Sequence, residues 1–96
     1  MIPVHISEAA AADLAAIYDY GADRFGEDVA EVYLRGFAQS FELIADHASI
    51  GAIHGTVHPP IRSLRHGSHR IYYDVFEDEV VVQRILHLAM DVGSHL

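Results

Sequence analysis

Apolar and polar residues alternate over Ile2–Ile6, and the pattern then changes to a helical spacing. The alternation predicts a short strand at the edge of a sheet. Ser7 offers an N-cap hydroxyl and Glu8 places a carboxylate in the first turn, so we expect a helix from Ser7 to Gly21, with room for one further turn. Its apolar stripe consists of Ala10, Leu14, Ile17 and Tyr18.

A second helix is predicted directly after the first. Asp28 and Glu31 have the spacing of a capping box, and helical periodicity continues for about four turns to Ile44. Gly36 lies inside this helix, where glycine costs about 1 kcal/mol relative to alanine, so we expect another backbone to approach closely there. The short connection predicts an antiparallel helical hairpin. The apolar stripe of the second helix consists of Ala30, Tyr33, Leu34, Phe37, Phe41 and Ile44.

The second half of the chain has the pattern of a sheet. Residues Ala48–Pro60 contain two glycines and two prolines without a helical period, which predicts a loop. Strands are expected at Ile61–Leu64, His69–Phe76 and Glu79–His87, followed by a short tail at Ala89–Leu96. The predicted fold is therefore α+β, with a short N-terminal strand and a helical hairpin packed on a small antiparallel sheet.

Length and composition restrict the class of protein. The 96 residues predict a single domain covering 1–96, and 51% hydrophobic against 21% charged residues predicts a folded chain. The absence of cysteine excludes a disulfide framework and a thiolate zinc site. The N-terminus lacks a basic leader, and no apolar run approaches the roughly 18 residues of a membrane span. We therefore expect a cytoplasmic protein without a membrane partner.

Charge is distributed unevenly along the chain. The formal net charge is −8, and residues 1–48 hold nine acidic residues against two arginines, which gives −7. Residues 49–96 carry −1 and six of the eight histidines. A field of this sign repels nucleic acid, so we expect no direct sequence-specific binding to it. The two halves are predicted to meet different partners.

Two histidine pairs have spacings that occur in metal sites. They are His54-x3-His58 and His66-x2-His69. The pairs fall in an expected loop and at an expected turn, with no cysteine and no helix to align their side chains. We therefore predict no metal site and no cofactor.

A third group has the residue types of an RNA-cleaving site. Tyr72, Tyr73, Arg70, Arg84 and His87 could supply a general acid and base and the cations for a phosphate. Strand alternation puts the two tyrosines on opposite faces, so at most one can join an arginine on an exposed face. No nucleophile activated by a neighbour is evident, and we assign no catalytic residue.

Two segments of the second half resemble the ParE toxins of bacterial type II toxin–antitoxin systems, within the RelE/ParE superfamily. The segments are Gly67–Val75 (GSHRIYYDV) and Arg84–Val92 (RILHLAMDV), and the second is the more specific. The resemblance covers nearly the whole chain. It implies a small α+β toxin that inhibits DNA gyrase and is not an enzyme. It also implies a ParD-like antitoxin as partner, whose disordered C-terminal segment folds onto the toxin in a hetero-oligomer.

The same resemblance suggests which residues meet each partner. The end of the last strand and the following segment are expected to contact the target, and the helical hairpin and the sheet edge are expected to contact the antitoxin. The target-contacting candidates are Arg84, His87, Met90, Asp91 and Val92. The antitoxin-binding candidates are Leu14, Tyr18, Tyr33, Phe37, Arg62 and Arg70.

Two alternatives stay open beside gyrase inhibition. The superfamily contains ribosome-dependent mRNA interferases of the RelE type, but this chain has no lysine and is strongly acidic, which disfavours RNA as a substrate. A non-toxic protein that only binds the antitoxin is the other alternative. The sequence also departs from the family pattern, because Asp74 stands where a basic residue commonly follows the tyrosine pair and the first helix is unusually acidic. We therefore expect a basic antitoxin segment.

Overall fold

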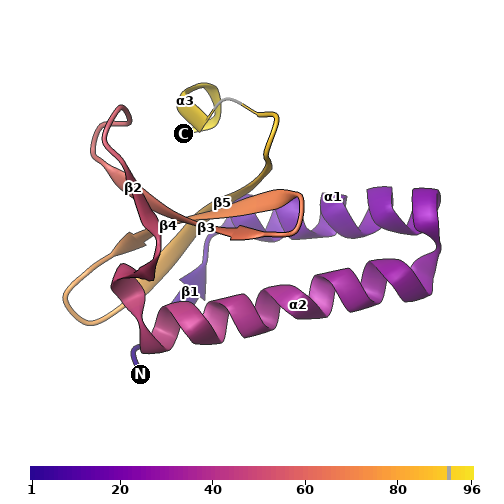
Figure 1. The fold of residues 1–96 in the computed structure, drawn as a ribbon, viewed down its shortest axis with the longest axis horizontal. Coiled ribbons are helices and arrows are strands. Elements are labelled where there is room, and N and C mark those ends of the chain that lie inside the picture. The colour runs from indigo at the N-terminus through magenta and orange to yellow at the C-terminus, as the bar shows by residue number, and fades with distance from the viewer. Residues whose placement is uncertain (91) are drawn as a thin grey trace.

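A five-stranded sheet carries two long helices on one face, and α3 lies on the other side of it (Figure 1). The structure is a computed structural model that describes residues 1–90 and 92–96. In these residues no helix combines the length and apolarity needed to cross a membrane. The strands are β1 (Val4–Ile6), β2 (Ala52–His54), β3 (Ile61–His66), β4 (His69–Val75) and β5 (Val80–His87). The helices are α1 (Glu8–Phe25), α2 (Glu27–Asp46), the 3-10 helix η1 (Ala48–Ile50) and α3 (Val92–His95).

The sheet has the order β1-β5-β4-β3-β2 and is mixed. Strands β2 to β5 form the expected antiparallel meander, whereas β1 pairs parallel with β5, with Val4 opposite Val80. The predicted α+β fold with a helical hairpin is confirmed, and so is the edge position of the N-terminal strand. The sequence does not predict the direction in which β1 pairs, because a long connection through both helices and strands β2 to β4 separates β1 from β5.

The first helix begins where the sequence predicts and ends later. The Ser7 hydroxyl accepts a hydrogen bond from the Ala10 N–H at 3.0 Å and donates one to the Gln83 carbonyl at 2.8 Å, which ties the cap to β5. The helix passes through Gly21 and stops at Gly26, where φ is +92°. A Cβ on Gly21 would meet only Ala30 at 3.4 Å, so this glycine allows close helix packing without ending the helix.

The predicted capping box is absent from the second helix. The N-cap is Gly26, without a side-chain hydrogen bond, and the helix begins at Glu27. Asp28 therefore lies within the first turn. Its negative charge interacts favourably with the helix dipole there, but its side chain does not cap the helix. One glycine with positive φ reverses the chain between the two helices, which leaves no room for a cap at Asp28.

The predicted loop over Ala48–Pro60 contains regular structure. It begins with η1 and continues into the edge strand β2, which pairs with β3. The buried Tyr73 hydroxyl holds this turn, because it donates to the Ala48 carbonyl at 2.8 Å and accepts from the Gly51 N–H at 2.9 Å. The prediction of an irregular loop was wrong here because a partner distant in sequence fixes the backbone.

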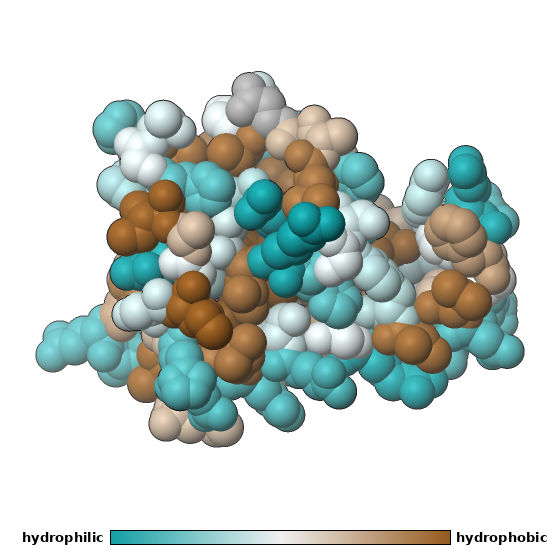
Figure 2. All heavy atoms as spheres, in the orientation of Figure 1, coloured by the Kyte–Doolittle hydropathy of each residue, from teal (hydrophilic) through white to brown (hydrophobic). Residues whose placement is uncertain are grey.

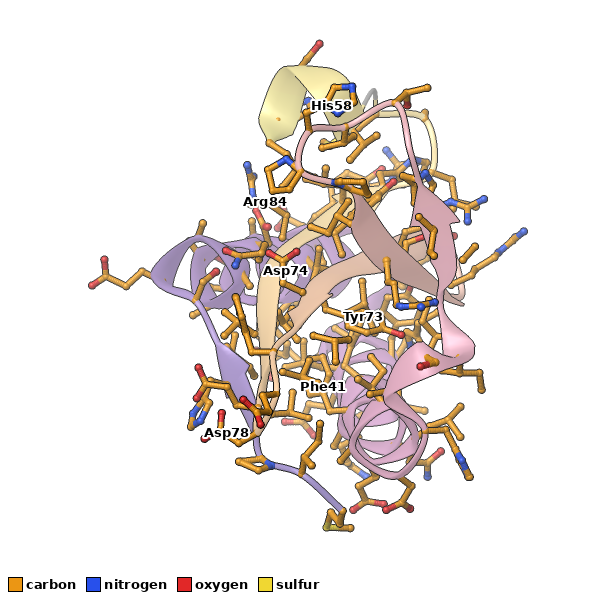
Figure 3. The ribbon with its side chains drawn as sticks, turned by 90° about the vertical axis from the view of Figure 1, so that its left-hand side faces the viewer. Phe41, His58, Tyr73, Asp74, Asp78 and Arg84 are labelled. Atoms are coloured by element: carbon orange, nitrogen blue, oxygen red, sulfur yellow. The ribbon has the colours of Figure 1, made fainter. Side chains whose placement is uncertain are left out.

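Tyr72 and Tyr73 lie on opposite faces of β4, as predicted, and both are buried. Tyr73 belongs to the main core beneath the helices, and Figure 3 shows it with Phe41 between the sheet and α2. Tyr72 belongs to a smaller cluster on the other face, which the β2–β3 loop and α3 cover. A register shift at this pair interrupts the ladder with β5. The smaller cluster consists of Ile61, Tyr72 and Leu86, with Val57 and Val92 packed against it.

Gly36 is closely approached, but by a side chain and not by a backbone. A Cβ at this position would collide with the imidazole of His66. That ring lies against Phe37, with centroids 4.3 Å apart, and its Nε2 is 3.2 Å from the Tyr33 carbonyl. The predicted close approach is confirmed, and the prediction that a backbone makes it was wrong.

Candidate functional site

Arg84 is turned inward at the end of the sheet. Its Nε and Nη2 donate to Oδ2 and Oδ1 of Asp13 at 2.8 and 2.9 Å, and its Nη1 donates to the His95 carbonyl at 3.0 Å. The same carboxylate accepts the Ile85 N–H at 2.9 Å. Hydrogen bonding to Asp13 raises the pKa of Arg84 above its ordinary value, although partial burial opposes this. The guanidinium therefore joins α1, β5 and α3.

The other target-contacting candidates differ in exposure. His87 is exposed, and its Nδ1 accepts the Ala89 N–H at 3.1 Å. Met90 is 47% exposed, while Val92 packs on the smaller cluster of the outer face. Asp91 lies outside the described residues. His87 and Met90 are thus open to a partner, whereas Val92 anchors the segment.

The six antitoxin-binding candidates do not form one surface. Phe37 is 1% exposed and belongs to the core, and Leu14, Tyr18 and Tyr33 are half-buried. Arg62 pairs with Tyr73, which places it on the helix-covered face, where it donates to the Ser49 and Gly51 carbonyls at 3.1 and 2.8 Å. Arg70 is two residues before Tyr72 on β4 and therefore lies on the opposite face.

Tyr33 contacts the β3–β4 turn and His69, the first residue of β4. Its hydroxyl accepts the Ser68 N–H at 3.0 Å, lies 3.0 Å from the His66 carbonyl and lies 2.7 Å from Nδ1 of His69. Gly67, with a φ of +56°, brings its backbone so close that a Cβ would collide with the Tyr33 ring. Burial raises the pKa of Tyr33, and the hydrogen bond from Ser68 opposes this. The Tyr33 hydroxyl therefore contacts three groups within the protein.

Two imidazoles, His66 and His69, lie against this phenol, and a third, His87, lies against His69. The His69 and His87 rings are 5.4 Å apart in a T-shaped arrangement, and the His66 ring lies 4.9 Å from Tyr33. Burial, and then the neighbouring imidazoles of His87 and His66, lower the pKa of His69 below its ordinary value. His69 is therefore held neutral under conditions in which a free histidine begins to charge.

A groove runs between the helical hairpin and the end of the sheet, and we call it the hairpin groove. Two cavities of about 430 and 330 Å³ share Ile17, Tyr20, His69 and His87, so they are parts of one depression. The first cavity extends to the hairpin tip, and its lining adds Gly21, Phe25, Val29, Ala30, Tyr33 and Ser68. The second extends to the chain end, and its lining adds Asp13, Ala16, Arg84, Ile85, Leu86, Met90 and His95.

The hairpin groove has an exposed apolar wall. Tyr20, Phe25 and Val29 are 61%, 62% and 55% exposed. In Figure 2 apolar side chains gather on the right-hand lobe, which is the end of the helical hairpin, and a hollow separates the upper part of this lobe from the body. None of these three residues was among the candidates predicted from the sequence, because they lie outside the stripes that pack the helices. Their signal is large apolar residues at positions that a surface helix normally fills with polar ones.

The histidine pairs do not assemble a metal site. His54 Nε2 lies 2.6 Å from the Ser63 hydroxyl, and the ring of His66, at the end of β3, packs against α2. Within residues 1–90 and 92–96, no group of three or more histidine, aspartate or glutamate side chains is arranged to hold a metal ion.

Two of the residues named for an RNA-cleaving site, Tyr72 and Arg84, lie opposite each other on β4 and β5, but one is buried and the other is engaged in an ion pair. Tyr72 is 4% exposed beneath Val57 and Val92, and burial raises its pKa. Arg84 is engaged by Asp13, as described above. Neither group is presented to solvent beside the other.

Comparison with known proteins places this geometry in a family. A family profile described as ParE toxin of type II toxin-antitoxin system, parDE, matches residues 4–92. The chain is 39% identical over 92 residues to Toxin ParE1 of Mycobacterium tuberculosis (strain H37Rv), covering 95% of this chain and 94% of the relative. It is 33% identical over 96 residues to Toxin ParE1 of Caulobacter vibrioides, covering 100% and 99%.

A solved structure gives the same assignment. The fold is similar, with a TM-score of 0.77 and 25% identity, to a chain of the chromosomal ParDE toxin–antitoxin system from P. aeruginosa, over 91% of this chain and 96% of that one. The family profile covers residues 4–92, and the alignments with both relatives cover at least 94% of each protein. The chain therefore belongs to the ParE family of toxins of type II toxin–antitoxin systems.

Proposed function

We propose that this toxin is neutralised by a ParD-like antitoxin that seats a segment in the hairpin groove, and that the free toxin inhibits DNA gyrase. The observation that carries the antitoxin proposal is the groove itself. Its wall exposes Tyr20, Phe25 and Val29, and a monomeric protein seldom leaves such side chains together in water. The similar solved chain comes from a ParDE system, which supports a partner of this kind.

The groove suits a peptide segment that becomes ordered when it binds. Its two parts, of about 430 and 330 Å³, can each accept side chains, and its apolar lining supplies the burial that offsets the ordering of a disordered segment. The floor offers His69 and His87 as hydrogen-bonding groups that fix the orientation of the segment. We expect alternate apolar residues of the antitoxin to occupy the two parts.

The charge of the hairpin supports a basic segment. Burial raises the pKa of Tyr18, and the carboxylates of Glu27 and Glu31 raise it further. Residues 1–48 carry −7, so lysines or arginines of the antitoxin would be attracted to this side. The association rate with purified antitoxin should fall as salt rises from about 50 to 500 mM. A rate that does not change with salt would remove the electrostatic part of the proposal.

The hydrogen bonds already made by two arginine side chains favour gyrase over RNA as the target. Arg84 is engaged by Asp13 and Arg62 by two carbonyls, so these two guanidiniums are not free to bind a phosphate. The acidic net charge of −8 also opposes RNA binding. Exposed His87 and Met90 form a mixed polar and apolar contact of the kind that fits a protein surface.

Two assays run side by side test the target. One measures supercoiling by purified gyrase, and the other measures cleavage of mRNA on purified ribosomes. We expect the toxin to inhibit supercoiling in proportion to its concentration and to leave the mRNA intact. Ribosome-dependent cleavage with normal supercoiling would overturn the gyrase proposal and favour the RelE-type alternative.

A further inference from the structure

Arg84 connects three segments that are distant in the sequence. It lies on β5, its ion pair reaches Asp13 on α1, and its Nη1 donates to the carbonyl of His95 at the end of α3. In Figure 3 the Arg84 label lies beside α1 and below α3. The side chains of Arg84 and Asp13 are 25% and 15% exposed, so this contact is partly shielded from water.

The chain end has two described anchors. Val92 packs on the smaller cluster formed with Tyr72 and Leu86, and His95 receives the bond from Arg84. A cation at the last carbonyls of a helix is favourable, because these groups have no partner within the helix. The described residue Met90 therefore lies between two anchored elements, β5 and α3.

Only an arginine makes this set of contacts. The planar guanidinium gives two parallel bonds to the carboxylate and still has an Nη1 hydrogen for the His95 carbonyl. An ammonium group has no such fork, so a lysine keeps the charge but cannot satisfy Asp13 and His95 together. Asp13 fixes the direction of the guanidinium and does so from another element, α1.

We infer that Arg84 is a positioning residue: through its fork on Asp13 it holds α3, and thereby sets the place of the segment around Met90 that meets the target. The inference rests on the proposed function, because it assumes that this segment contacts the target. It differs from the sequence-based expectation, in which Arg84 itself makes the contact. With its donors directed to Asp13 and His95, Arg84 acts through α3.

The test measures amide exchange at the chain end by NMR. In the wild type the Leu96 N–H donates to the Val92 carbonyl at 3.1 Å, and the Leu88 N–H donates to the Ser68 carbonyl at 2.9 Å and serves as an internal reference. In Arg84→Lys the Leu96 amide should exchange about tenfold faster than in the wild type. This difference corresponds to the loss of one charge-assisted hydrogen bond. Exchange at Leu88 should change less than about twofold. Asp13→Asn, which alters no described contact of α3 directly, should have the same effect.

The matched control is Arg65→Lys. Arg65 Nε donates to the Gly67 carbonyl at 2.9 Å in the β3–β4 turn, so this variant makes the same chemical change away from α3. Its Leu96 exchange should equal that of the wild type. Unchanged Leu96 exchange in Arg84→Lys, or equal acceleration at Leu88 and Leu96, would overturn the positioning role.

Growth of cells that express each variant without antitoxin supplies the functional readout. Arg84→Lys and Asp13→Asn should be at least about tenfold less toxic than Arg65→Lys at equal protein levels. Accelerated exchange with full toxicity would overturn the link between α3 and the target. A wild type without toxicity would refute the proposed function instead, and the exchange data would still decide whether Arg84 holds α3.

Discussion

The hydroxyl of Tyr33 on α2 lies 2.7 Å from Nδ1 of His69 on β4. This contact joins the helical hairpin to the sheet at the floor of the hairpin groove. A phenol has one proton, so Tyr33 donates either to His69 or to the His66 carbonyl 3.0 Å away, while it accepts the Ser68 N–H. When His69 carries a proton on Nδ1, Nδ1 donates to the Tyr33 hydroxyl, and the hydroxyl donates its own proton to the His66 carbonyl.

Removal of this hydroxyl should destabilise the protein. Tyr33→Phe leaves the Ser68 N–H, the His66 carbonyl and His69 Nδ1 without the partner that they share. We expect the free energy of unfolding to fall by about 1–3 kcal/mol, measured by urea denaturation at pH 7.5. The control Tyr20→Phe, at a side chain that is 61% exposed, should stay within about 0.5 kcal/mol of the wild type. Equal stability of the two variants would contradict the assigned role.

Stability should decrease on acidification because of His69. Its pKa is lowered in the folded protein, so below the ordinary value of 6.5 the unfolded chain takes up a proton that the folded chain resists. The stability that neutral His69 contributes is therefore complete above about pH 6.5 and is lost as the pH falls through its lowered value.

Urea denaturation at several pH values between about 5 and 8 measures this effect. His69→Gln cannot take up a proton in this range, so its free energy of unfolding should depend less steeply on pH than that of the wild type. Parallel pH profiles for the two proteins would show that His69 does not contribute.

The two glycines inside the long helices, Gly21 and Gly36, should respond in opposite directions to alanine. A Cβ at Gly21 would meet Ala30 at 3.4 Å, an ordinary contact, so Gly21→Ala should stabilise the protein by about 0.4–1 kcal/mol. A Cβ at Gly36 would collide with the His66 ring, which is confined by Phe37. Gly36→Ala should therefore destabilise by about 1–3 kcal/mol. Thermal melting of both variants checks the signs, and stabilisation by Gly36→Ala would refute the packing described for His66.

The fold was largely predictable because local signals and tertiary contacts agree in most elements. The Ser7 cap, the apolar stripe at Ala10 and the alternation over β4 each fit the observed structure. The predictions were wrong where a distant partner decides the local structure. Tyr73 orders η1, and the capping-box residues were outweighed by Gly26, whose positive φ starts the second helix earlier.

The candidate site was less accessible to sequence reasoning. Asp13 and Arg84 are 71 positions apart, and no local pattern indicates that they bind each other. Arg84 was predicted to contact the target, and the sequence gives no sign that its donors bind Asp13 and the His95 carbonyl. Helical periodicity likewise identifies the buried stripe but not the exposed wall at Val29, because a groove is formed only when the hairpin packs against the end of the sheet.

The wall of the hairpin groove provides a matched pair of antitoxin-binding variants. Val29 lines the groove and is 55% exposed, whereas Val32, three residues further along α2, is 66% exposed and is not among the lining residues. A charge at Val29 would be desolvated by a bound apolar segment. Val29→Asp should therefore weaken antitoxin affinity at least about tenfold, and Val32→Asp less than about threefold, by calorimetry. Equal effects of the two variants would place the antitoxin elsewhere.

The central claim is that this chain is a toxin controlled by an antitoxin, and colony counts after induction test it most directly. Cells carry the chain under an inducible promoter, with or without its ParD-like antitoxin under a second promoter. We expect colony-forming units to fall by at least about a hundredfold when the chain is expressed alone, and to recover fully when the antitoxin is expressed with it. Undiminished colony counts with the chain expressed alone, at a protein level verified by immunoblot, would contradict the claim.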